Sequence, residues 1–351
     1  MKIAIDCRLI GQSGIGTFIE NIAEEIIKHT EHQFLLIGNP EKLKHYLIYG
    51  NCKIAECTYR SFSFKELFCF PTKRVNQCDA FFTPNFNIPL GIKTPLSCTI
   101  HDIVFFDTAN FGNFIERFVI KKYITRALRI SVNVFTVSKF SKSRIEEQFP
   151  IRNDIHVVHD AINKKLKEYK QTHRSVDAKD RRGIVFLGNL KKHKGISTLL
   201  DAYSKLVEDG IRTPLTIIGK LNFRTKDNSV LPKVKKFGDL IHIESNATDE
   251  DVYRIISHSE VLVSPSLYEG FGIPPLEALY LETPVIISDI PVYKEIYNSL
   301  PVTYFKAGDA TDLYIKIKEG PKSPITNLQN KINSLYNFEF TTQKLLDYIC
   351  N

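Results

Sequence analysis

The chain has 351 residues, of which 43% are hydrophobic and 25% charged, and this composition excludes an intrinsically disordered chain. The length suits two domains that each bury a core of their own. The net charge of +8 is compatible with a phosphate-bearing substrate, an anionic membrane surface or nucleic acid, and no apolar run is long enough to span a bilayer.

The first half of the chain alternates strand and helix patterns. It begins directly with an apolar strand and shows no signal-peptide core, so we expect a cytoplasmic protein. A helix is predicted after that strand, because Ile19, Ile22 and Ile26 recur at helical spacing. Short runs rich in Val, Ile and Phe predict buried parallel strands at 3–7, 34–38, 80–83, 96–100, 134–138 and 155–158.

Residues 114–130 combine basic and apolar side chains at helical spacing. A solvated helix face explains this pattern most simply. A membrane-surface patch for a lipid-linked acceptor, giving peripheral contact with the membrane, is the sharper alternative. Nucleic-acid binding is not expected, because no recognition motif accompanies the charge.

Residues 164–182 are polar and charged, which predicts a linker or an exposed connection. The alternation then restarts, and strands are predicted at 184–188, 215–219, 240–244, 261–265, 285–289 and 302–305. Two successive runs of this kind predict an α/β protein with two doubly wound, Rossmann-like domains that face each other across a cleft. Ligands of such sheets bind at the carboxyl ends of the strands.

The seven cysteines are odd in number and form no C-x-x-C pair, so free thiols are expected rather than disulfides or a metal site. No D-x-D carboxylate pair stands in a loop suited to a metal. We therefore expect no metal and no cofactor.

Two motifs follow predicted strands of the first half. The sequence Gly11-Gln-Ser-Gly14-Ile-Gly16 opens a helix, and it suits either a tight turn or a loop whose amides approach a phosphate. His101 and Asp102 follow strand 96–100. His101 can donate to a sugar hydroxyl or a phosphate, although a lone histidine is more often structural, and Asp102 can orient the ring or cap the next helix.

Two further motifs follow predicted strands of the second half. The loop 188–195 crowds three lysines and a histidine before a helix start, where cations oppose the helix dipole, and a bound anion would resolve that conflict. The stretch 264–278 is the strongest signal. A Gly-Phe-Gly turn leads into a helix that begins with prolines, and Glu269 and Glu277 are separated by seven residues.

The sequence EGFGIPPLE resembles the E-x7-E signature of the retaining GT-B glycosyltransferases of family 4, in particular the bacterial mannosyltransferase-like branch that builds O-antigens and capsules. DCRLIGQSGIGTFIENI, HDIVFF, FTVSKFSKSRI and FLGNLKKHKGISTLLDAY are similar to other motifs of that branch, so the resemblance covers nearly the whole chain. YNFEFTTQKLLDYI looks like its closing helix. The resemblance implies a first, acceptor-side domain of residues 1–165 with helix 338–351 crossing back onto it, and a nucleotide-sugar domain of residues 183–337.

The resemblance also implies the roles of individual residues. The catalytic set would be His101 against the donor sugar, Lys194 against the diphosphate and Glu269 against the sugar hydroxyls. The donor-binding set would be Gly14, Gly16, Asn189, Lys191, Lys192, Ser245, Asn246, Gly270, Phe271, Gly272 and Glu277. Within that set Glu277 would hold the ribose, and the base would lie near 245–248.

The implied reaction is metal-independent transfer of a hexose, with mannose from GDP-mannose as the best guess, to a glycan or lipid-linked acceptor. The nucleotide sugar is the substrate, and the anomeric configuration is retained. One departure stands out, because Asn189 and His193 occupy the positions where the family places an arginine, which leaves Lys191 or Lys192 as its substitute. A nucleotide-sugar 2-epimerase-like isomerase and an inactive nucleotide-binding partner subunit stay as alternatives.

Overall fold

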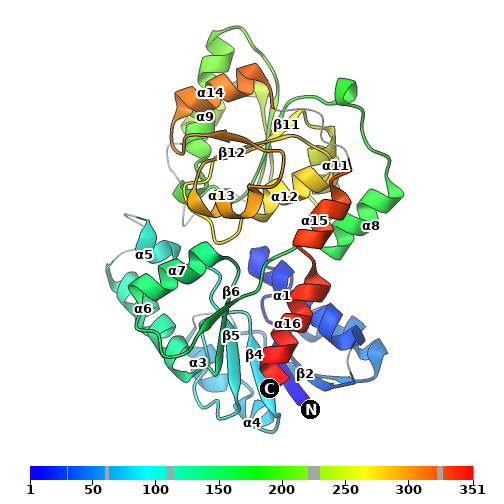
Figure 1. Ribbon diagram of the computed structural model, residues 1–351, viewed down its shortest axis with the longest axis vertical. Helices are drawn as coiled ribbons and strands as arrows, with labels where there is room; N and C mark the ends of the chain where they lie inside the picture. The colour runs from blue at the N-terminus through cyan, green and yellow to red at the C-terminus, as the bar shows by residue number, and fades with distance from the viewer. Residues whose placement is uncertain (30, 60–62, 109–113, 220–229, 322–326, 351) are drawn as a thin grey trace. The chain divides into compact units, whose positions relative to one another are not determined.

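The computed structural model describes residues 1–29, 31–59, 63–108, 114–219, 230–321 and 327–350. The chain forms two compact units, Met1–Asn163 with Tyr336–Asn351, and Lys164–Leu335 (Figure 1). Each unit is built on one wholly parallel sheet, as the alternating strand and helix patterns predict. The seven cysteines are free thiols.

The sheet of the first unit has seven strands. Their order is β3 (Cys52–Glu56), β2 (Gln33–Gly38), β1 (Lys2–Asp6), β4 (Ala80–Thr83), β5 (Leu96–Thr99), β6 (Asn133–Thr136) and β7 (Ile155–Val157). The six strands predicted in this half are all present. The edge strand β3 was missed, because Lys53 and Glu56 interrupt its apolar pattern and only one of its flanks is paired.

Helices of the first unit bury both faces of this sheet. Phe81 of β4 packs with Ile124 and Leu128 on one face, while the next residue, Phe82, points to the other face and meets the ring of Phe135 at 6.2 Å. The helices are α1 (Ser13–His29), α2 (Pro40–Leu43), α3 (Phe64–Cys69), α4 (Thr72–Val75), α5 (Val104–Asp107), α6 (Phe114–Ile130), α7 (Lys139–Gln148) and α16 (Phe338–Cys350), with the 3-10 turn η1 (Lys44–Tyr49).

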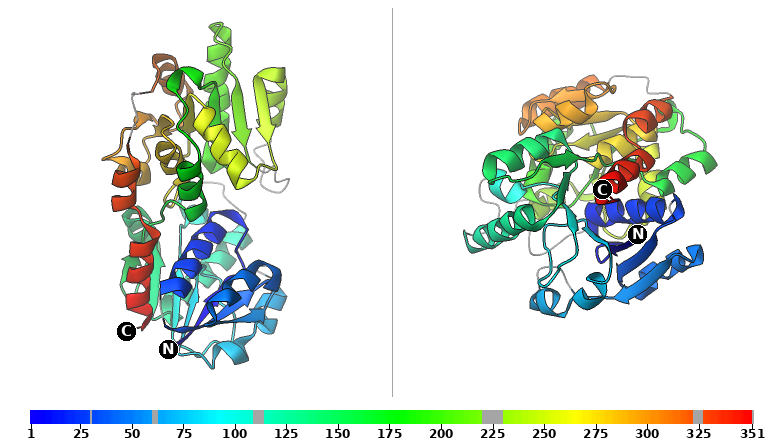
Figure 2. Two further views of the ribbon diagram at one scale, coloured as in Figure 1. Left: turned by 90° about the vertical axis from the view of Figure 1, so that its right-hand side faces the viewer. Right: turned by 60° about the horizontal axis from the view of Figure 1, so that its bottom comes forward.

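The closing helix α16 belongs to the first unit, as the resemblance implied. It runs beside α1 (Figures 1 and 2). Thr341 Oγ1 donates to the carbonyl of His159, and Asn133 donates to the carbonyl of Tyr348. These bonds join the end of the chain to residues near β6 and β7.

The sheet of the second unit has six strands, and all six were predicted. Their order is β10 (Ile241–Glu244), β9 (Leu215–Ile218), β8 (Ile184–Leu187), β11 (Val261–Ser264), β12 (Val285–Ser288) and β13 (Thr303–Phe305). The surrounding helices are α8 (Lys164–Thr172), α9 (Ile196–Glu208), α10 (Val230–Lys236), α11 (Asp249–His258), α12 (Ile273–Tyr280), α13 (Pro291–Tyr297), α14 (Ala310–Glu319) and α15 (Gln329–Leu335), with the 3-10 turns η2 (Ala178–Asp180), η3 (Lys192–Lys194) and η4 (Gly238–Leu240).

The predicted linker is wrong for its first half, because Lys164–Thr172 folds as α8. Leu166 is fully buried, and the Tyr169 ring lies 5.5 Å from that of Tyr253 on α11. Lys170 Nζ lies 2.9 Å from Glu282 Oε2. A helix that anchors itself through one leucine, one tyrosine and an ion pair leaves little apolar periodicity in its sequence.

The ion pair of α8 makes a pH-dependent prediction. Burial opposes ionisation of Glu282, but hydrogen bonds from Ser175, Lys170 and Gln329 outweigh it and lower the pKa of Glu282 from 4.5 to about 2. A carboxylate with a depressed folded-state pKa stabilises the fold above its unfolded-state pKa, and that contribution is lost as the pH falls through the folded value. We expect Glu282→Gln to be less stable than wild type at neutral pH, with the difference closing between pH 4.5 and 2 in urea denaturation. A difference that stays constant over this range would contradict the assignment.

Candidate functional site

Two loops that carry predicted site residues begin at neighbouring strands of the second sheet. β8 and β11 pair in parallel, so their carboxyl ends lie at the same edge of the sheet. The basic loop 188–195 follows β8, and the glycine turn 265–272 follows β11. The topology therefore brings together two motifs that are more than seventy positions apart in the sequence.

Backbone contacts hold these two loops together. The amide of Leu267 donates to the carbonyl of His193 at 2.7 Å. Gly195 has a φ of +67°, and a Cβ on it would lie 1.8 Å from the carbonyl oxygen of Pro265. Any other residue at 195 would therefore push the basic loop away from the glycine turn, so this glycine sets their spacing.

Lys194 and Glu269 form an ion pair between the two loops. Lys194 Nζ lies 2.6 Å from Oε1 and 2.8 Å from Oε2 of Glu269, and Ser266 Oγ donates to Oε1 at 2.8 Å. The two side chains are 19% and 11% exposed, so the pair is partly shielded from water. An ammonium has three N–H donors, and two of them serve the carboxylate here. The third N–H of Lys194 can therefore donate to a bound anion.

The glycine turn ends in a conformation that two tyrosines fix. Gly272 has a φ of +88°, and a Cβ on it would lie 2.3 Å from a ring carbon of Tyr293. Tyr297 donates to the carbonyl of Gly272, and the hydroxyls of Tyr293 and Ser264 lie 2.7 Å apart. α12 then begins at Ile273 with Pro274 in its first turn, as the sequence predicted, and Glu277 lies buried within it.

Tyr293 and Tyr297 were missed by the sequence analysis. They stand four residues apart on α13, directly after β12, so they share one helix face. That spacing beside the end of a buried strand is the signal that could have identified them. Burial raises the pKa of Tyr293 well above its usual range, so the hydroxyl stays protonated and available for hydrogen bonding.

The basic loop contains one buried histidine that carries no charge at neutral pH. Burial, with a smaller contribution from the neighbouring Lys194, lowers the pKa of His193 to about 4. His193 therefore cannot replace the cation that the family places in this loop. Asn189 and Lys192 are exposed, and Lys191 is partly exposed. The positive charge of the loop consequently rests on its three lysines.

Ser245 and Asn246 lie at the same edge of the sheet but farther along it. They follow β10, which β9 separates from β8. Two strand spacings amount to roughly 10 Å. The amide of Asn246 donates to Glu244 Oε1 at 3.2 Å, so this turn is hydrogen-bonded to the last residue of β10. The structure thus does not bring these two residues against Lys194 and Glu269 directly.

The predicted residues of the first unit have mainly structural contacts. A Cβ on Gly16 would lie 2.1 Å from the carbonyl oxygen of Leu9, so Gly16 is needed for the loop to pack. Gly14 is exposed, and a Cβ there would meet nothing within 4 Å. Asp102 Oδ1 accepts from the amide of Val104 and so helps to start α5.

His101 is held as a neutral imidazole. Burial lowers its pKa to about 4, against the opposing effect of a hydrogen bond with the carbonyl of Pro84. The ring meets Phe18 edge-on at 4.9 Å. Within the part of the chain that the structure describes, the buried Nε2 atom has no hydrogen-bond partner. A buried ring nitrogen of this kind suits a hydrogen bond with a ligand hydroxyl.

The described ranges contain no group of three His, Cys, Asp or Glu side chains placed to hold a metal ion. None of the helices in those ranges is both long and apolar enough to cross a membrane.

Comparison with known proteins identifies similar chains. Residues 168–332 match the family "Glycosyl transferases group 1". Over 223 residues the chain is 27% identical to the O-antigen chain mannosyltransferase B of Escherichia coli, a match that covers 61% of this chain and 58% of that protein. The chain thus spans little more than half the length of this curated relative.

Solved structures show the fold. Sucrose-phosphate synthase from Thermosynechococcus elongatus matches with a TM-score of 0.77 at 16% identity, over 99% of this chain and 98% of that one. Anabaena Alr3699/HepE in complex with UDP-glucose matches with a TM-score of 0.74 at 14% identity, over the same shares. The chain therefore has the predicted GT-B fold of two Rossmann-like domains.

Proposed function

We propose that the protein is a retaining glycosyltransferase, and the match of residues 168–332 to the family "Glycosyl transferases group 1" supports this proposal. The protein moves a hexose, with mannose from GDP-mannose as the specific proposal, to a glycan or lipid-linked acceptor in surface polysaccharide synthesis. The named relative, an O-antigen mannosyltransferase, supports the choice of sugar and pathway. We place the reaction in the cytoplasm, as the sequence predicted.

The observation that carries this proposal is the Lys194–Glu269 pair at the adjoining ends of β8 and β11. The ammonium suits a diphosphate and the carboxylate suits sugar hydroxyls, and because they stand 2.6 Å apart, both can serve neighbouring parts of one nucleotide sugar. The turn 270–272 lies beside them and leads into α12, so its amides and the helix start favour a phosphate.

The proposed reaction breaks the bond between the sugar C1 and the β-phosphate oxygen. A bond forms between C1 and an acceptor hydroxyl oxygen, and the hydroxyl proton passes to the leaving phosphate on the same face of the sugar. Negative charge grows on that phosphate as it departs, and the lysines of the basic loop stabilise it without a metal. The carboxylate of Glu269 orients the sugar hydroxyls, and Glu277 holds the ribose. No protein nucleophile is needed.

The other predicted roles stay as proposals. Phe271 and Gly272 place the turn amides, and Asn189, Lys191 and Lys192 complete the phosphate contacts. Ser245 and Asn246 lie at the edge where the base would extend. In the first unit, Gly14 and the Nε2 atom of His101 are available to a donor, whereas Gly16 keeps its loop packed.

The nucleotide preference can be tested by thermal shift. We expect GDP to raise the melting temperature more than UDP or dTDP at equal concentration, because a ligand that binds only the folded state stabilises it by mass action. Inorganic phosphate at the same concentration serves as the control for charge alone. A larger shift with UDP or dTDP would reject GDP-mannose as the donor. Shifts no larger than that of phosphate would contradict nucleotide binding itself.

A further inference from the structure

Helix α6 of the first unit exposes large apolar side chains to solvent. Four of them lie in its first two turns and are Phe114 (83% exposed), Ile115 (72%), Phe118 (54%) and Val119 (42%). A helix that merely covers a core buries such residues and turns its polar side outward. Here the inward side is already supplied by Ile124, Ala127 and Leu128, which pack into the sheet core. The exposed apolar residues are therefore additional to those the fold needs.

The same helix is strongly basic. It has five basic residues and a single acidic one, Glu116. Lys121, Lys122 and Arg129 are exposed. At about 100° of rotation per residue, Phe114, Phe118 and Lys122 follow one another along a single stripe, and Arg129 falls within it. Ile115 and Lys121 flank this stripe, and Glu116 lies beyond Val119, on the side of the helix away from the stripe. Lys122 Nζ lies 5.3 Å from the centre of the Phe118 ring, so cation and aromatic ring are direct neighbours.

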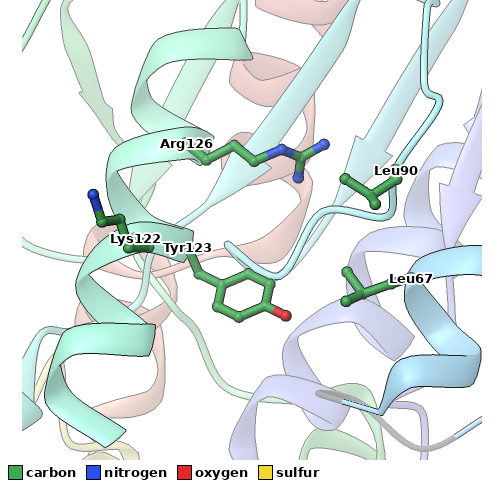
Figure 3. Close-up of a pocket in the computed structure, with 5 residues that line it drawn as sticks. All are labelled: Leu67, Leu90, Lys122, Tyr123 and Arg126. Atoms are coloured by element: carbon green, nitrogen blue, oxygen red, sulfur yellow. The ribbon is translucent and has the colours of Figure 1, made fainter. Parts of the chain in front are cut away.

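A pocket of about 230 Å³ adjoins this face and is lined by Leu67, Leu90, Lys122, Tyr123 and Arg126. Tyr123 and Arg126 point from α6 toward Leu67 and Leu90 on the opposite wall (Figure 3). Arg126 donates to the carbonyls of Ile88 and Pro89. These bonds fix α6 to the neighbouring loop without using a carboxylate, so the positive charge of Arg126 is added to that of the lysines.

We infer that this face of α6 binds the surface of an anionic phospholipid membrane. The residues that define the face are Phe114, Ile115, Phe118, Val119, Lys121, Lys122 and Arg129. The apolar side chains enter the headgroup–acyl boundary, and the lysines lie at the level of the lipid phosphates. Charge complementarity selects anionic lipid, and the apolar content selects a lipid surface over a nucleic acid, whose backbone offers nothing to Ile115 or Val119. This binding needs no sugar donor, so it is separate from the proposed reaction.

The test is flotation of the full chain with lipid vesicles, without donor or acceptor. We expect binding to vesicles of phosphatidylglycerol and phosphatidylethanolamine, weak binding to phosphatidylcholine, and loss of binding at high salt. Phe114→Ser with Phe118→Ser is expected to reduce the partition constant at least about tenfold. Lys121→Ser with Lys122→Ser is expected to reduce the partition constant roughly 10- to 30-fold, because each basic residue near the membrane surface contributes a factor of about five.

Matched controls separate this face from general surface character. Phe340→Ser removes a phenylalanine of α16 that is 73% exposed, and Lys235→Ser with Lys236→Ser removes an adjacent exposed pair on α10. Both controls should bind vesicles like wild type, and all variants should keep the wild-type melting temperature. Equal losses in control and α6 variants would overturn the inference. So would tighter binding to an oligonucleotide than to vesicles, or a dimer that only the α6 variants dissociate.

Discussion

Replacement of Glu269 by glutamine is expected to reduce sugar transfer by at least about 100-fold while the fold stays intact. The carboxylate accepts two hydrogen bonds from Lys194 and one from Ser266. Glutamine keeps the shape of the side chain but loses its charge, so Lys194 is no longer held between the two loops. It also offers the sugar hydroxyls one acceptor oxygen in place of two. Steady-state turnover with the nucleotide sugar that thermal shift selects is the measurement.

A second lysine–glutamate pair of the same unit supplies the control. Lys170 and Glu282 lie 2.9 Å apart and are 16% and 13% exposed, so they match the Lys194–Glu269 pair in chemistry and burial. Glu282→Gln is expected to lower stability and to leave turnover per folded molecule unchanged. Near-normal turnover of Glu269→Gln, or an equal loss in both variants, would remove Glu269 from the site.

Replacement of Arg8 by methionine is expected to lower the free energy of unfolding by about 3–5 kcal/mol, because two buried carboxylates then lose the cation that pairs with them. Arg8 bonds Asp6 through Nη2 at 2.7 Å and Glu66 through Nη1 at 2.5 Å. The three side chains are at most 6% exposed, and the guanidinium also lies 4.8 Å from the centre of the Phe70 ring. Although burial disfavours its charge, Asp6 and Glu66 raise the pKa of Arg8, so it remains a cation.

Urea denaturation measures this loss, with Arg74→Met as the control. Arg74 belongs to the same unit, is exposed, and donates to the carbonyl of Ile54. Its replacement should move the unfolding midpoint little. Arg8→Lys should recover only part of the loss, because an ammonium cannot reproduce the planar fork that serves both carboxylates. Equal midpoints for Arg8→Met and Arg74→Met would contradict the assigned role.

Much of the fold was readable because buried parallel strands leave a simple signal. Strands such as Val261–Ser264 and Val285–Ser288 are continuous apolar runs, and both are fully buried. The signal fails where burial is one-sided or depends on charge. β3 at the sheet edge mixes buried and exposed residues without regular alternation, and α8 is anchored by an ion pair whose glutamate is more than a hundred positions away.

The sequence predicted each loop of the candidate site separately, but not the contacts between the loops. Glycines and prolines marked the turn 265–272 and the lysines marked the basic loop, but the sequence did not show that Lys194 and Glu269 are partners. That contact depends on β8 lying next to β11, which is a property of the sheet order. The tyrosines of α13 and the Arg8 cluster were missed for the same reason, since each acts on residues distant in the chain.

A crystal structure of the protein with the nucleotide sugar that thermal shift selects would show whether Lys194 and Glu269 hold the donor. We expect the diphosphate to lie within hydrogen-bonding distance of Lys194 Nζ and of the amides of 270–272, with Glu269 against the sugar hydroxyls. A nucleotide bound away from the ends of β8 and β11, or a diphosphate that leaves Lys194 paired with Glu269 alone, would contradict this expectation.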